Sequence, residues 1–162
     1  MLGAVAVRRS RDSLMVQTTV KGEAGVALGT GLRRLAPYVR GDNRERRVMV
    51  AVAPIIQRAG TPGTWTVQIG LAYADAASGA PSPRSGKVRL VHAPGETFAV
   101  MRVPGRPSPA ACGRGESAIR AALDGTGWVA SGRAMIRLPC AFGLLRWTDY
   151  FEVAIPVAAL PQ

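Results

Sequence analysis

Cysteine, histidine and lysine are scarce in this sequence of 162 residues, which contains two cysteines, one histidine and two lysines. Cys112 and Cys140 are too few for a disulfide framework, and neither belongs to a CxxC pair or another zinc-ligand spacing. His92 alone cannot supply a histidine cluster for a metal. These absences exclude a disulfide-stabilised fold and a zinc module, and they predict free thiols in a reducing compartment, most simply the cytoplasm.

Long hydrophobic runs are also missing. The N-terminal stretch MLGAVAVRRSRDSL has no basic region ahead of its short apolar start, so it does not resemble a secretory signal. No stretch approaches the roughly 18 consecutive apolar residues that a membrane helix needs. We therefore expect no membrane partner. The hydrophobic fraction of 48% is sufficient for the core of one globular domain, residues 1–162.

Positive charge, in contrast, is abundant and comes almost entirely from arginine. The formal net charge is +11, with only ten acidic residues. Such a charge suits an anionic partner, but the one dense cluster, RGDNRERR, is interrupted by Asp42 and Glu45. No helix-turn-helix, zinc finger or aromatic RNA-binding motif accompanies it. We expect no specific nucleic-acid binding; an interaction module that binds acidic partners through its arginines stays open as a weaker alternative.

Apolar periodicity and turn residues predict the same order of elements twice. Leu28, Leu32, Leu35 and Val39 recur at helical spacing and form one apolar stripe. The expected elements are strands at 4–8 and 14–20, a helix at about 24–39, and strands at 48–56 and 65–73, followed by strands at 88–92 and 97–103, a helix at about 114–123, and strands at 130–138 and 150–157.

This order indicates a tandem duplication of a strand, strand, helix, strand, strand unit. The halves cover about 1–75 and 88–162, and a Pro/Ser/Gly-rich surface link, 76–87, joins them. The fold class is α+β, with a twisted pair of antiparallel sheets or a distorted β-barrel flanked by two helices. The proline-rich segment 105–115 is expected to be a mobile loop ahead of the second helix.

Glycines make the first predicted helix unusual. Gly25, Gly29 and Gly31 each cost up to about 1 kcal/mol relative to alanine in a helix interior. They do not form a phosphate-binding loop, because GxGxxG spacing and the P-loop lysine are missing. Something other than helix propensity must hold this helix, and its glycines indicate a place where another group packs closely.

Five segments, in order along most of the chain, resemble the SOUL heme-binding family. They are YVRGDN at 38–43, VAVAPI at 50–55, WTVQIGL at 65–71, PSPRSGKVRLVHAPGETFAVMRVPG at 81–105 and DYFEVAIPV at 149–157. The resemblance implies that heme or a related tetrapyrrole lies against the first helix and beneath the loop before the last strand. The residues so implicated are Leu28, Leu32, Arg33 and Ala36 on the helix, and Phe142, Leu144, Leu145, Arg146 and Trp147 in the loop.

The matching helix face lacks an iron ligand. His92 falls at the end of a strand in the second half and is a weak metal candidate, while Met49 and Met101 lie in apolar strands and are expected in the core. We therefore predict a shallow apolar cleft without a strong axial ligand, with heme as the one cofactor considered. Arg33 or Arg146 would meet the carboxylates of a small hydrophobic ligand with an acidic edge. The protein is expected to be a non-catalytic monomer or weak dimer.

An alternative function arises from the duplicated architecture, which also resembles the GyrI-like small-molecule-binding group, some of whose members hydrolyse reactive ligands. Strand alternation sends Glu152 to the face opposite Phe151 and Val153. It is either a pocket carboxylate able to act as a general base or an exposed residue paired with an arginine. With Tyr73, Trp128 and Trp147 as partners, the chain would be a hydrolase or isomerase acting on a hydrophobic small molecule.

Overall fold

The computed structural model describes residues 4–139 and 149–161. The α+β class is confirmed. In chain order the elements are β1 (Ala6–Arg9), β2 (Ser13–Lys21), α1 (Ala24–Val39), β3 (Ala51–Ala59), β4 (Thr64–Leu71), α2 (Tyr73–Ala77), β5 (Arg89–Ala93), β6 (Thr97–Pro104), α3 (Pro109–Leu123), β7 (Trp128–Ala130), β8 (Met135–Leu138) and β9 (Tyr150–Ala159).

One antiparallel sheet runs through both halves of the chain. Its order is β1-β6-β9-β8-β3-β4-β2-β5, and β7 pairs with β9 outside this path. The halves join where β3 pairs with β8, from Ile55 opposite Leu138 to Arg58 opposite Met135. We call this line of pairing the seam. Among the described strands β1 and β5 end the path without pairing to each other, so the sheet is open and the distorted barrel is not formed.

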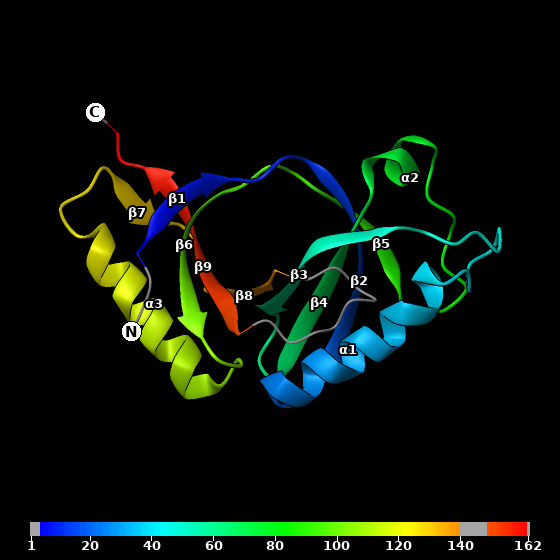
Figure 1. The fold of residues 1–162 in the computed structure, drawn as a ribbon, viewed down its shortest axis with the longest axis horizontal. Coiled ribbons are helices and arrows are strands. Elements are labelled where there is room, and N and C mark those ends of the chain that lie inside the picture. Colours follow the sequence, from blue (N-terminus) through cyan, green and yellow to red (C-terminus); the bar gives the residue numbers. More distant parts are fainter. Residues whose placement is uncertain (1–3, 140–148, 162) are drawn as a thin grey trace.

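The two halves exchange their first strands. β1 precedes β2 in the chain but pairs with β6, and β5 precedes β6 but pairs with β2. The two connectors therefore cross, and they lie side by side on the side of the sheet away from α1 and α3 (Figure 1). Ser10 N donates to Glu96 O at 2.9 Å where they meet, and Gly95 N donates to the carboxylate of Asp12. We call residues 10–12 and 94–96 the crossing connectors.

The long helices α1 and α3 pack on one face of the sheet (Figure 1), each through a glycine. A Cβ added to Gly31 would lie 2.5 Å from Val67 Cγ2, and one added to Gly115 would lie 2.9 Å from Val153 Cγ2. Val67 and Val153 belong to β4 and β9, the last strands of the two units. Both helices thus approach the sheet at the point where a side chain would keep them away, which explains the glycines at positions 31 and 115.

Replacing Gly31 by alanine should destabilise the protein, although alanine is the better helix former. The added methyl group would overlap the fully buried Val67, so we expect a loss of about 1–3 kcal/mol in the free energy of unfolding. Gly29→Ala is the matched control, because its Cβ would meet only the flexible end of Arg33 at 3.5 Å; it should stabilise by up to about 1 kcal/mol.

Urea unfolding of both variants would test this prediction. The double variant with Gly31→Ala and Val67→Ala should recover part of the loss, because the smaller side chain makes room for the methyl group. Equal stability changes at positions 29 and 31 would show that α1 does not approach β4 as closely as the structure indicates.

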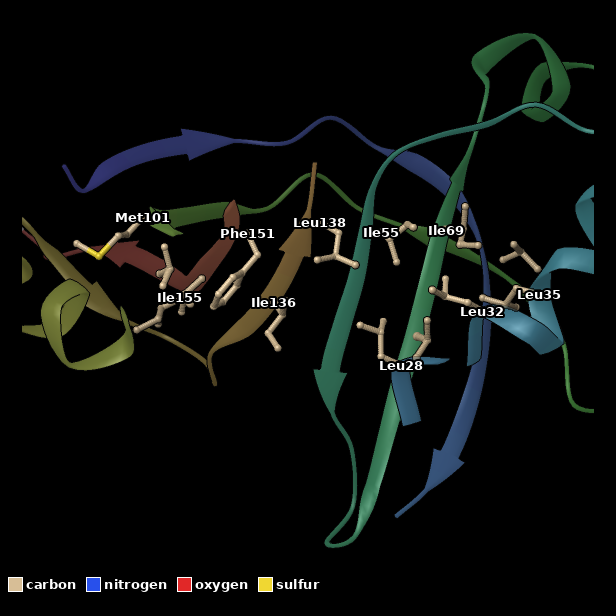
Figure 2. Close-up of a cluster of buried hydrophobic side chains, with 14 of the residues drawn as sticks. Leu28, Leu32, Leu35, Ile55, Ile69, Met101, Ile136, Leu138, Phe151 and Ile155 are labelled. Carbon is tan, nitrogen blue, oxygen red and sulfur yellow. The ribbon is translucent and has the colours of Figure 1, made fainter. Parts of the chain in front are cut away.

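The main hydrophobic core lies between this face and the two helices. Figure 2 shows it as a continuous row, from Met101 and Ile155 near α3, through Phe151, to Leu32 and Leu35 on α1. A smaller cluster lies on the opposite face, beneath the crossing connectors; its buried members are Met15, Ile56, Phe98, Val100, Met135 and Ala154. Met49 and Met101 are 3% and 5% exposed, which confirms that they are core residues.

Three stretches differ from the sequence-based prediction. The strand expected at 130–138 is divided into β7 and β8, with 131–134 between them. The segment 105–115 is not a loop throughout, because α3 begins at Pro109, where the Ser108 hydroxyl accepts a hydrogen bond from Ala111 N. Serine as N-cap followed by proline at the first helical position is a strong helix start. Tyr73 does not end a strand but begins the short helix α2, so the link 76–87 starts inside a helix.

Candidate functional site

The apolar face of α1 that was expected to line a cleft is part of the core. Leu28, Leu32 and Ala36 are 5%, 8% and 9% exposed and face the sheet. A ligand could reach them only by separating α1 from the strands beneath it. Arg33, in contrast, lies exposed on the outer side of the helix, where its guanidinium donates to Thr30 Oγ1 at 3.1 Å. Of the helix residues predicted to meet a ligand, Arg33 alone is therefore accessible.

Arg33 borders a hollow of about 230 Å³ where α1 meets the link after α2. We call it the arginine hollow. Its lining residues are Arg33, Arg34, Pro37, Tyr38, Asp42, Pro83, Arg84, Ser85 and Val88. Sequence reasoning missed Arg34, Arg84 and Asp42. The one available signal was the arginine in PSPRSG, which lies in a segment that resembles the family.

The charge balance of the arginine hollow is positive. Arg34 Nη1 donates to Thr19 O at 2.9 Å, which holds one guanidinium against β2. Arg84 Nη1 and Asp42 Oδ1 are 3.8 Å apart and both side chains are more than half exposed, so this ion pair is weak. Three guanidinium groups face one carboxylate. The hollow therefore suits a ligand group with two negative charges.

A buried asparagine shapes this hollow. Asn43 is fully buried; its side-chain amide donates to Tyr38 O and Arg47 O, and its Oδ1 accepts from Arg47 N. An isolated bridge pairs Asn43 with Pro83, which brings the link against the end of α1. Glycine at position 41, with φ of 109°, allows the reversal between helix and turn. The YVRGDN segment thus fixes the geometry that places Arg84 near α1.

Iron ligation is not supported at this site. Tyr38 is the one lining residue whose type can bind heme iron, and it is 2% exposed. Burial raises the pKa of Tyr38, and its hydroxyl donates to Pro81 O at 2.9 Å, so the neutral phenol is held in place. His92 is exposed on β5, in the edge strand. The described residues therefore fit the carboxylates of a heme but not its iron.

The second half of the predicted cleft lies outside the described residues. This applies to Phe142, Leu144, Leu145, Arg146 and Trp147, and also to Cys140. Cys112 is half-buried on α3, and burial raises the pKa of its thiol, which disfavours the reactive thiolate. Within the described ranges, no group of three or more His, Cys, Asp or Glu side chains lies close enough together to hold a metal ion.

Glu152 is buried, and arginines already occupy its carboxylate. It is 6% exposed on β9, on the face opposite Phe151 and Val153 as strand alternation predicted. Oε1 accepts from Arg8 of β1 at 3.2 Å, and Oε2 accepts from Arg137 of β8 at 3.4 Å. Burial lowers the pKa of Arg137, and the carboxylate of Glu152 opposes this effect. The guanidinium of Arg137 also lies 4.3 Å from the Phe98 ring centre, in a cation–π contact.

The residues predicted to act with Glu152 lie far from it. Tyr73 is 88% exposed on α2, and Trp128 is on β7; these two elements are at opposite ends of the molecule (Figure 1). Trp128 pairs with Ala159, seven residues along β9 from Glu152. The structure therefore does not assemble the catalytic set proposed from the sequence, and Trp147 lies outside the described residues.

Together, the exchanged first strands and the two glycine-packed helices define a duplicated α+β protein with an open sheet. The sequence profile of the SOUL heme-binding protein family matches residues 3–138. The chain belongs to this family. No curated protein matched the sequence. Among the described residues, no helix has the length and apolar character needed to cross a membrane.

Solved structures with the same fold share little sequence with this chain. The C-terminal domain of EcmrR has a TM-score of 0.68 at 8% identity, covering 99% of this chain and all of that one. EcmrR in its DNA complex has a TM-score of 0.70 at 8% identity, with coverage of 99% of this chain; the chain spans only 59% of that longer protein. A hydrolase from Listeria innocua has a TM-score of 0.64 at 9% identity, covering 95% and 91%. These similarities establish the fold alone.

Proposed function

We propose that this protein binds a tetrapyrrole, or a similar flat apolar molecule with two carboxylates, without ligating iron and without catalysing a reaction. The observation that carries the proposal is the arginine hollow, where three guanidinium groups face one carboxylate at the end of an exposed helix face. Membership of the SOUL family supports the class of ligand. The positive charge of the arginine hollow supports binding of the ligand through its acidic edge.

The outer face of α1 offers a flat surface for the apolar ring. Gly25, Val26 and Pro37 are exposed along it, with Val26 at 63%, and Gly29 is half-buried. A Cβ at Gly25 would meet nothing within 4 Å, so the backbone is open to a ligand there. From Val26 to Pro37 the helix rises by about 16 Å over eleven residue steps. Contact with this surface would remove apolar area of the ring from water.

The carboxylates of the ligand would bind in the arginine hollow. Guanidinium holds a carboxylate through two parallel hydrogen bonds, which fixes its orientation as well as its position. Arg33 and Arg84 are exposed and can turn toward a ligand, whereas Arg34 is tied to Thr19 and supplies a fixed charge. Binding of this kind uses the charge of the ligand and requires no axial ligand from the protein.

Iron-free mesoporphyrin IX should bind about as tightly as hemin, because iron contributes no bond to the described residues. Its dimethyl ester should bind at least about tenfold more weakly, since esterification removes charge-assisted hydrogen bonds. The double variant with Arg33→Gln and Arg84→Gln should weaken binding of the free acid to a similar extent and leave the ester unaffected. The Soret band of each porphyrin, followed during titration, measures these affinities.

Arg114→Gln is the matched control, because Arg114 is exposed on α3, away from the hollow. It should leave all affinities unchanged. The proposal fails if no porphyrin gives a saturable change, or if the ester binds as well as the acid. Hemin that binds far more tightly than mesoporphyrin would show that iron is ligated after all.

A further inference from the structure

A second and larger hollow, of about 360 Å³, lies at one end of the seam. β3 contributes Arg58 and Ala59, the crossing connector contributes Glu96, and the segment 131–134 and Pro156 complete the lining. We call it the seam hollow. It shares no residue with the arginine hollow. Because both halves of the duplicated chain line it, a ligand bound here would touch both at once.

The seam hollow carries one positive charge in excess. Arg58 Nη2 and Glu96 Oε2 form an ion pair at 2.9 Å, in which both side chains are 34% exposed. The exposed Arg133 has no acidic partner in the described part of the chain that would neutralise it, and its hydrogen bond from Nη1 to Gly60 O is long, at 3.3 Å. A guanidinium has five N–H donors, so Arg133 can hold an anion and keep this bond.

The floor of the seam hollow is small, apolar and fixed. Ala59, Ala134 and Pro156 provide it. Ser131 N donates to Pro156 O at 2.8 Å, which ties the segment to β9. A Cβ at Gly132 would lie 3.0 Å from Pro156 Cγ, so the absence of a side chain is what permits this close contact. A ring or short chain can rest on this floor without the protein having to rearrange.

We infer that the seam hollow binds a small organic anion, whose carboxylate or phosphate pairs with Arg133 while its apolar body rests on Ala59, Ala134 and Pro156. Its volume is at the lower end of the range for small-molecule sites, so the ligand is smaller than a tetrapyrrole. Binding stabilises the fold, because the ligand contacts both sides of the seam and the unfolded chain has no such site.

Four probes that share one ring test the inference: benzoate, phenyl phosphate, benzyl alcohol and benzamidinium. Benzoate or phenyl phosphate should raise the melting temperature of the full chain in a saturable manner, and calorimetric titration gives the dissociation constant. Comparison of the two anions identifies whether the site takes a carboxylate or a phosphate. The neutral alcohol and the cation should bind at least about tenfold more weakly.

Arg133→Gln should weaken binding of the anion about tenfold, while Arg114→Gln and Arg33→Gln should have no effect. Arg133 is exposed, so the variant is expected to fold normally. The inference is overturned if none of the probes binds, if benzyl alcohol binds as well as benzoate, or if Arg33→Gln rather than Arg133→Gln removes binding, which would place the anion in the arginine hollow.

Discussion

Glu152→Gln should reduce the free energy of unfolding by about 3 kcal/mol, because it breaks a buried ion pair from one side. The change keeps the shape of the side chain, removes its charge and replaces one of the two accepting oxygens by an NH2 group, which cannot accept from an arginine. Arg137, whose side chain is 14% exposed, would then lose the negative charge that offsets the cost of its burial. Breaking a buried ion pair from one side costs more than the pair contributes, because the remaining charge is uncompensated. Thermal or urea unfolding measures the loss.

Two further variants make this result specific. Glu116→Gln breaks an exposed ion pair with Arg120 on α3 and should cost less than about 1 kcal/mol. The double variant with Glu152→Leu and Arg137→Met removes both charges and should recover most of the stability, since apolar residues of similar size often replace a buried pair without loss. If Glu152→Gln costs no more than Glu116→Gln, the carboxylate is not structural, and the pocket-acid interpretation becomes the better one.

The interpretation of Glu152 illustrates what strand alternation can and cannot predict. Its face on β9 followed from the period of two residues and is correct. Its partners did not follow, because Arg8 is 144 residues away in sequence and lies on a strand exchanged between the halves. No local pattern states that β1 pairs with β6 instead of β2. The carboxylate, expected either in a pocket or exposed beside an arginine, does have arginine partners but is buried against them, and only the topology brings them to it.

The fold itself was largely predictable, because it depends on local periodicity. The apolar stripe from Leu28 to Val39 predicted the helix α1, and the repeated order of elements predicted the duplication. The site was less predictable for a physical reason. An apolar helix stripe indicates burial but not what buries it; the sheet covers Leu28 and Leu32, so the ligand face that we propose is the exposed, glycine-rich one.

A site is hardest to predict from the sequence when a turn and a distant link each contribute residues to it. Arg84 meets the end of α1 only because the Asn43 turn pairs with Pro83. The sequence marked both segments as similar to the family, but neither charge nor spacing showed that they lie together. Asn43 is therefore the residue on which the geometry of the arginine hollow depends most directly.

Asn43→Asp should reduce the free energy of unfolding by about 2–4 kcal/mol, although the two side chains have nearly the same shape. The amide nitrogen of Asn43 donates to two carbonyl oxygens, at 3.1 Å to Tyr38 and 2.7 Å to Arg47. An ionised carboxylate has no proton to donate, so it would place negative charge against both oxygens in a fully buried position. Asp42→Asn, at the exposed neighbouring position, should change the stability by less than about 0.5 kcal/mol.

The loss caused by Asn43→Asp should depend on pH, which separates it from a simple packing defect. Burial disfavours the charged form, so the introduced carboxyl should have a higher pKa in the folded protein than its value of about 3.9 in the unfolded chain. The folded state then binds the proton more tightly, and stability is regained as the pH falls through the folded pKa. At neutral pH the variant should also bind mesoporphyrin more weakly than the unchanged protein. A loss that is the same at pH 5 and pH 8, with unchanged porphyrin affinity, would show that the amide of Asn43 does not organise the arginine hollow.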